Sequence, residues 1–204
     1  MMRFFFYILY VFFTTKNVFP QSSFSKLSRP EKCWAISHLI KAKKAQTITK
    51  QVQLVVDSVK RSNSIGTDNN GGKLDAFKHA YWMASLAIEI GRNQALKLGN
   101  AHEKGNYLQF KKRLLEDTFL PDSVSSVMDL KNNEFGVSVV AKCQNLSSTT
   151  IQKKIMDGFA NGKLSTIKKD EEGNFLTCEG GIISLKEWTG KWGIPKCIEP
   201  SLNH

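Results

Sequence analysis

The chain has 204 residues, with 29 lysines and arginines against 18 acidic residues and a formal net charge of +11. This is the length of one ordinary domain, which can bury a substantial core without help from metals or disulfides. With 41% hydrophobic and 23% charged residues, the composition excludes an intrinsically disordered, low-complexity or collagen-like chain.

The N-terminal segment predicts a secretory signal. Arg3 precedes an unbroken apolar run, FFFYILYVFF at residues 4–13, and a region of small residues follows at 18–23. This order is typical of a signal peptide, and the run is about half of the roughly 20 residues that a membrane-spanning helix needs. We therefore expect residues 1–23 to be a signal peptide and the protein to be exported, to the periplasm, the cell surface or the medium. An uncleaved anchor is the alternative, and no later segment is apolar enough to span a bilayer.

The basic character persists without the signal peptide. Loss of residues 1–23 removes Arg3 and Lys16 and leaves 27 basic against 18 acidic residues, a net charge of +9. Such a charge favours an acidic partner: an anionic envelope polymer, an anionic lipid or nucleic acid. The lysines are scattered in pairs without interleaved aromatic residues, so there is no specific nucleic-acid motif. A merely solvated basic surface is the alternative.

Four cysteines, an even number in an exported chain, predict disulfides. Cys178 and Cys197 bracket the C-terminal segment and are the natural pair. A bond between Cys33 and Cys143 would tie the first helix to the last core helix. Four buried free thiols are the alternative.

Hydrophobic periodicity predicts a mainly α fold, a bundle of about five to six helices over residues 24–163. A small β-hairpin or loop-rich tail is expected over residues 164–204, with a hairpin turn at Gly173-Asn174. The expected helices are 29–45, 47–61, 74–90, 93–113 with a break near Gly105, 121–143, and one that starts at 147–150 and ends at 161. The Gly-rich segment 66–72 is expected to be a turn.

Two predicted helices carry histidines beside carboxylates. Asp75 and His79 are four residues apart and face the same side, so the carboxylate can orient the ring or share a metal ion with it. A cap by Asp75 with a simple hydrogen bond from His79 is the structural alternative. His102 and Glu103 are adjacent and cannot share a face. Residue 106 is asparagine, which excludes the H-E-x-x-H zinc motif.

A third predicted helix has an unusual polar face. Asp129, Asn132, Asn133 and Gly136 recur at spacings of three and four residues. Short polar residues form helices poorly, and glycine costs about 1 kcal/mol relative to alanine in a helix. We therefore expect this face to meet polar groups inside the fold, with a close neighbour over Gly136. A solvated face is the alternative.

Two functions fit if the bundle gathers these residues into one interior cleft. In a hydrolase acting on an anionic substrate, Asp75 would orient His79 as general base, His102 would be an acid–base group or a metal ligand, and Asp129 and Asn133 would hold a metal or an oxyanion. Candidate metal ligands are His79, His102 and Asp129, for a divalent ion such as zinc or calcium. Alternatively, the residues form a buried hydrogen-bond network in a non-catalytic envelope or secreted binding module.

Three motifs resemble those of the family called domain of unknown function 6973: DAFKHAYWMA (75–84), LGNAHEKGN (98–106) and MDLKNNEFG (128–136). The resemblance covers roughly residues 65–142, and the order and spacing match. It implies a helical domain of the exported Bacteroidetes-type form, with no established activity. Lys78 stands where the family usually has arginine, which argues against a role that needs a guanidinium group. The family pattern places the site at Asp75, His79, His102, Glu103, Asp129, Asn132 and Asn133.

Overall fold

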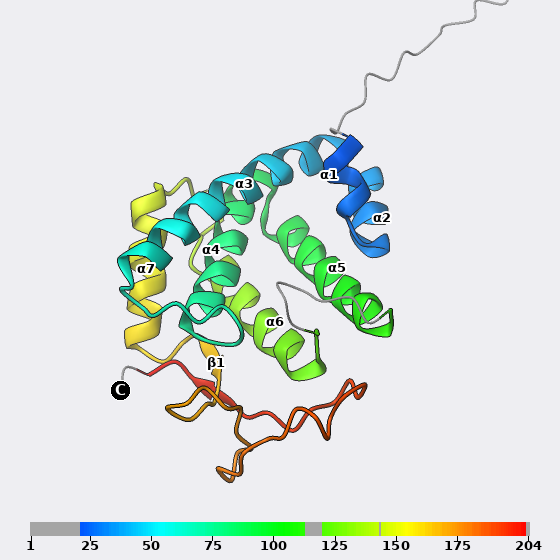
Figure 1. Ribbon diagram of the computed structural model, residues 1–204. Coiled ribbons are helices and arrows are strands. Elements are labelled where there is room, and N and C mark those ends of the chain that lie inside the picture. Colours follow the sequence, from blue (N-terminus) through cyan, green and yellow to red (C-terminus); the bar gives the residue numbers. More distant parts are fainter. Residues whose placement is uncertain (1–20, 113–119, 143, 203–204) are drawn as a thin grey trace, which may run out of the picture.

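The computed structural model describes residues 21–112, 120–142 and 144–202. The predicted signal peptide therefore lies outside the described residues as far as residue 20. The described residues form a mainly α-helical fold with a short antiparallel sheet near the C-terminus (Figure 1), which confirms the predicted fold class. No described helix combines the length and apolar character needed to cross a membrane. The elements are α1 (Gln21–Lys26), α2 (Arg29–Ser37), α3 (Leu39–Ser62), α4 (Lys73–Ile90), α5 (Arg92–Lys111), α6 (Ser123–Ser138), α7 (Ser148–Ala160), β1 (Ser165–Ile167) and β2 (Ile198–Pro200).

Helix α4 is the centre of the bundle and packs against α3, α5, α6 and α7 (Figure 1). Apolar residues occur all around it, and Leu74, Phe77, Met83 and Leu86 are almost completely buried. A helix that is apolar on every side belongs in the interior of a protein. Polar residues on α4 are consequently placed inside the fold, where they need partners.

Helix α6 lies directly on the backbone of α4. A Cβ atom at Gly136 would be 2.2 Å from the carbonyl oxygen of Ala80 and 2.8 Å from its Cα. No residue with a side chain fits at this distance, which confirms the expected close neighbour over Gly136. The contact turns the polar face of α6 towards α4.

The first helical boundary differs from the prediction. The chain breaks at His38, and α3 continues through residues 45–47, where a boundary was expected. The Ser37 hydroxyl donates to the Cys33 carbonyl at 2.8 Å, and Nδ1 of His38 lies 2.9 Å from the Trp34 carbonyl. These side chains engage the carbonyls of the last turn of α2, and such local bonds compete with helix continuation.

The expected break at Gly105 is also absent, because α5 is continuous from Arg92 to Lys111. A Cβ at residue 105 would lie 2.4 Å from the Oγ of Ser28, the N-cap residue of α2. Glycine therefore allows α2 and α5 to pack closely at this position.

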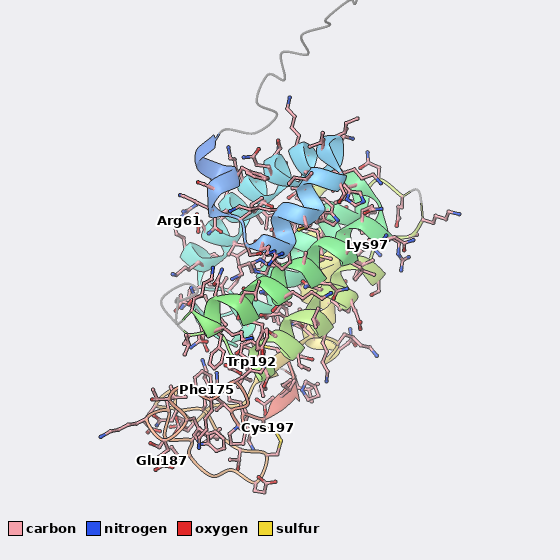
Figure 2. The ribbon with its side chains drawn as sticks, turned by 90° about the vertical axis from the view of Figure 1, so that its right-hand side faces the viewer. Arg61, Lys97, Phe175, Glu187, Trp192 and Cys197 are labelled. Carbon is pink, nitrogen blue, oxygen red and sulfur yellow. A yellow bond between two sulfur atoms is a disulfide. The ribbon has the colours of Figure 1, made fainter. Side chains whose placement is uncertain are left out.

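In the tail, β1 pairs with β2, from Ser165 opposite Pro200 to Ile167 opposite Ile198. The turn expected around Gly173 is present, with a bridge between Lys169 and Phe175. The tail docks onto α5 through Trp192, whose ring lies 5.1 Å from that of Tyr107 and 5.0 Å from that of Phe110 (Figure 2).

The predicted disulfide between Cys178 and Cys197 is present in the tail (Figure 2). Cys33 is exposed and forms no disulfide within the described part of the chain. Its expected partner, Cys143, lies outside the described residues.

We predict that Gly136→Ala lowers the free energy of unfolding by about 1–3 kcal/mol, because the new methyl group must push α6 away from α4. Urea unfolding followed by circular dichroism measures this. The matched control is Lys131→Ala, an exposed position of the same helix, whose effect should stay within about 0.5 kcal/mol. Equal unfolding midpoints for the two variants would contradict the close contact.

Candidate functional site

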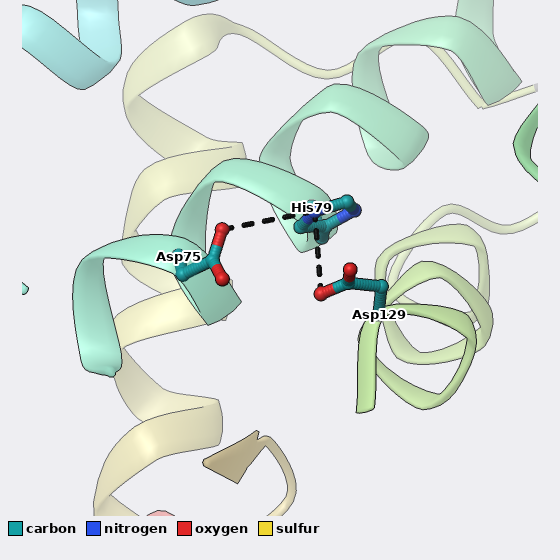
Figure 3. A group of neighbouring side chains, drawn as sticks. All are labelled: Asp75, His79 and Asp129. Atoms are coloured by element: carbon teal, nitrogen blue, oxygen red, sulfur yellow. Dashed lines mark ion pairs between the residues drawn. The ribbon is translucent and has the colours of Figure 1, made fainter. Parts of the chain in front are cut away.

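Three buried side chains from α4 and α6 meet in the interior (Figure 3). The Nε2 atom of His79 lies 3.7 Å from Oδ1 of Asp75 and 3.3 Å from Oδ1 of Asp129. The three residues are only 8% (Asp75), 4% (His79) and 6% (Asp129) exposed. One possible ligand atom from each lies within 4.8 Å of the other two. Among the described residues, this is the group of histidine and carboxylate side chains that could hold a metal ion.

Asn133 contacts the other ring nitrogen of His79. Its Oδ1 lies 3.3 Å from Nδ1, and the residue is 1% exposed. An amide oxygen only accepts hydrogen bonds, so in this orientation Nδ1 carries a proton. Nε2 then faces two carboxylates. A proton on Nε2 or a metal ion between the ring and the carboxylates would make this contact more favourable.

The Gly-rich turn positions Asp75. The Gly71 N–H donates to Oδ2 of Asp75 at 2.9 Å, and Gly71 has a φ of +83°. The other oxygen, Oδ1, lies 3.2 Å from Nζ of Lys78 as well as near His79. One oxygen is therefore fixed by the backbone, and the other lies between the Lys78 ammonium and the His79 ring.

His102 lies beside this cluster, with its ring centre 6.4 Å from that of His79. Its Nδ1 lies 3.0 Å from Oε1 of Glu31, and its side chain is 29% exposed. Sequence reasoning missed Glu31 as part of the site. That residue belongs to the capping box of α2, in which Oε2 accepts the Ser28 N–H at 2.7 Å. In the structure, the second oxygen of the same carboxylate binds His102.

Glu103 points away from His102, as expected for adjacent helical residues. It is 6% exposed, and its Oε2 accepts a hydrogen bond at 3.1 Å from Nδ2 of Asn106, which is 2% exposed. Asn106 was not among the predicted residues. Its only sequence signal was its position, which a second histidine would occupy in the zinc motif.

Asn132 contacts the tail and does not reach His79. Its Nδ2 donates to the Ser165 carbonyl at 2.9 Å, and its Oδ1 accepts the Ser165 N–H at 2.9 Å. The side-chain amide thereby pairs with β1 as a neighbouring strand would. Two adjacent asparagines on α6 thus have different partners.

The structure therefore brings together Asp75, His79, Asp129 and Asn133, with His102 alongside, while Glu103 and Asn132 have their own contacts. The molecule is a mainly helical domain with a buried histidine–carboxylate centre between two helices. Residues 32–163, more than half of the chain, match the family described as "Domain of unknown function (DUF6973)", and the chain belongs to that family. The match contains all seven candidate residues, and Glu31 lies just outside it. No curated protein and no solved structure matches the chain.

We predict that Asn132→Ala lowers the free energy of unfolding by about 2–4 kcal/mol, because two hydrogen bonds to the Ser165 backbone are lost. It should also accelerate proteolytic cleavage of residues 164–202, which limited proteolysis measures. Gln152→Ala, a substitution at a half-buried position of α7, serves as the control. Unchanged proteolysis in Asn132→Ala would contradict the role in holding the tail.

The contact between Glu31 and His102 predicts a pH dependence of stability. Burial raises the pKa of the Glu31 carboxyl, but the hydrogen bond and charge of His102 and hydrogen bonds from Ser28 outweigh it and lower that pKa. The contact therefore stabilises the fold fully above the pKa of an unfolded-chain glutamate, about 4.3. This contribution is lost as the pH falls through the lower pKa that Glu31 has in the folded protein.

Urea unfolding of the native protein and Glu31→Gln at several pH values tests this, because glutamine keeps an oxygen for the cap and removes the charge. The difference in the free energy of unfolding between the native protein and Glu31→Gln should shrink as the pH falls below about 4.3. A difference that does not change with pH would refute the prediction.

Proposed function

We propose that this protein is an exported, metal-dependent hydrolase whose single divalent ion is held by Asp75, His79 and Asp129. The observation that carries the proposal is the environment of His79. One ring nitrogen contacts the amide oxygen of Asn133, while the other faces two carboxylates at 3.3 and 3.7 Å. A metal-binding histidine commonly donates its second N–H to an oxygen acceptor in this way.

The distances favour zinc or a similar ion. Bonds of 2.0–2.2 Å in a tetrahedral site place neighbouring ligand atoms about 3.3–3.6 Å apart, close to the two His79 contacts. Three protein ligands with one open position are typical of catalytic zinc. Calcium prefers six to eight oxygen ligands, which this set of side chains serves poorly.

Two half-buried groups at the edge of the cluster, Lys78 and His102, support an anionic substrate. An ion at this centre would supply an activated water molecule. Hydroxide would add to the phosphorus or carbonyl carbon of an ester, and the bond to the leaving oxygen would break. The leaving oxygen would take up a proton from solvent or from His102.

Export is part of this proposal. It is supported by the signal-like sequence of residues 1–23 and by the disulfide between Cys178 and Cys197, because disulfides persist in oxidising compartments.

A non-catalytic module is the second candidate, favoured by the burial of the cluster. If the Asn133 amide is turned, its Nδ2 donates to Nδ1 of His79, and Nε2–H donates to Asp129. Nδ2 has no hydrogen-bond partner among the described residues in the present orientation. The turned amide would complete a network without any metal ion.

Metal content separates the two candidates. We predict about one zinc or similar ion per chain by elemental mass spectrometry after exhaustive dialysis, because three buried ligands hold it. The ion should be lost from His79→Ala and Asp129→Asn and retained in Asp57→Asn, the matched control outside the cluster. The loaded protein should hydrolyse a chromogenic phosphodiester or carboxylic ester, and the two metal-free variants should not.

A native protein without metal would defeat the metal-dependent proposal. In that case, a loss of about 1–3 kcal/mol of stability in His79→Ala would support the hydrogen-bond network. A metal-loaded protein without hydrolytic activity would leave the metal site standing and defeat the catalytic part.

A further inference from the structure

We propose that an exposed face on α2 and α3 docks the protein onto an anionic lipid surface. This α2–α3 face is formed by Ile36, Leu39, Ile40, Lys43, Lys44, Lys50 and Leu54. It is separate from the His79 cluster, and the proposal does not depend on the proposed function.

The first observation is the exposed apolar area. Ile36 is 63%, Leu39 48%, Ile40 80% and Leu54 69% exposed. Nine large hydrophobic residues are exposed in the described part of the chain, and four of them lie on this face. Ile36, Leu39 and Ile40 flank the break at His38, at the junction between the two helices. Clustered exposed apolar side chains indicate an interaction site.

The second observation is the charge. From Lys32 to Val56 the sequence contains five lysines and no acidic residue. On α3, Lys43 and Lys44 lie one turn from Ile40 and are exposed, and Lys44 is paired at 3.7 Å with Glu89 of α4. Leu54 follows Ile40 by nearly four whole turns, about 21 Å along the axis. The face is therefore long and cationic, with aliphatic residues at both ends.

Aliphatic side chains interleaved with lysines fit the boundary between lipid headgroups and acyl chains. Nucleic acid offers phosphates to the lysines, but single-strand binding also uses aromatic stacking, and the exposed apolar residues here are isoleucine and leucine. Anionic lipid satisfies both kinds of side chain.

The third observation is the position of α1, the N-terminal helix of the described chain. Lys32 of α2 donates to the Ser25 carbonyl of α1 at 3.1 Å and lies 5.9 Å from the Phe24 ring centre. Helix α1 is therefore held against α2, close to the face. The sequence before α1 contains the apolar run of residues 4–13. In the unprocessed chain, the predicted signal segment therefore precedes the domain at this end.

Cys33 allows a local test, because it is exposed and lies one turn before Ile36 on α2. The full-length protein with Cys143→Ser is labelled at Cys33 with a small environment-sensitive fluorophore. Vesicles of phosphatidylcholine alone, or mixed with phosphatidylglycerol, are then added. We expect a blue shift, and quenching by nitroxide-labelled lipid, only with phosphatidylglycerol, and both should weaken as salt is raised.

Ile40→Asp should raise the vesicle concentration needed for half-maximal shift by about tenfold or more, since an apolar contact is replaced by a repelled charge. The matched control is Ile182→Asp in the tail, at a residue that is 68% exposed, and its binding should not change. All variants share residues 1–20, so any binding through the apolar run is common to them.

Three results would overturn the proposal: no shift with phosphatidylglycerol, equal shifts with both vesicles, or equal loss in the two variants. If double-stranded DNA shifts the emission and vesicles do not, the face binds nucleic acid and the lipid assignment is wrong. None of these results alters the metal content, so a failure here is distinguishable from a failure of the hydrolase proposal.

Discussion

The contact between Gly136 and the Ala80 backbone determines the geometry of both the fold and the site. A Cβ at residue 136 would lie 2.2 Å from the Ala80 carbonyl oxygen, so the backbones of α6 and α4 are in direct contact at this point. Asp129 and Asn133 occupy the preceding turns on the same face of α6. They consequently reach His79 directly, at 3.3 Å in both cases. Any larger residue at 136 would separate the helices, and the cluster would lose its short distances.

The C-terminal tail also contacts α6 and stabilises its position against α4. Asp122 caps the first turn of α6 and is paired at 2.7 Å with Lys196, and both side chains are buried. Asn132 binds β1, and the Ile167 N–H of β1 donates to the Gly71 carbonyl at 2.7 Å. The tail thereby contacts α6 and the turn that positions Asp75. Residues 164–202 are part of the support of the site, and the adjacent residues Asn132 and Asn133 divide the contacts of α6 between tail and cluster.

Sequence spacing predicted which side chains share a helical face, and the structure confirms the pairing of Asp75 with His79 and the buried face of α6. Spacing does not say what a face meets. The contact of Glu31 with His102 joins residues 71 positions apart, and the partner of β1 comes from the end of the chain. The break at His38 depends on local hydrogen bonds from Ser37 and His38, which no apolar pattern records. Asn132 lies on the predicted face but far enough round it to reach β1 instead of His79.

The catalytic and the structural alternatives differ in one group, the amide of Asn133. Two buried carboxylates beside a neutral ring are costly unless a positive charge compensates them, and Nζ of Lys78 lies 3.2 Å from Oδ1 of Asp75. With Oδ1 towards Nδ1, the ring directs Nε2 at Asp75 and Asp129, which is the arrangement that the proposed metal site requires. With Nδ2 towards Nδ1, the ring donates to Asp129 and needs no ion. A Cβ at Gly99 would lie 3.0 Å from Nδ2, so glycine at that position leaves room for the amide in its present place. The orientation of this amide therefore distinguishes the proposed metal site from the proposed hydrogen-bond network.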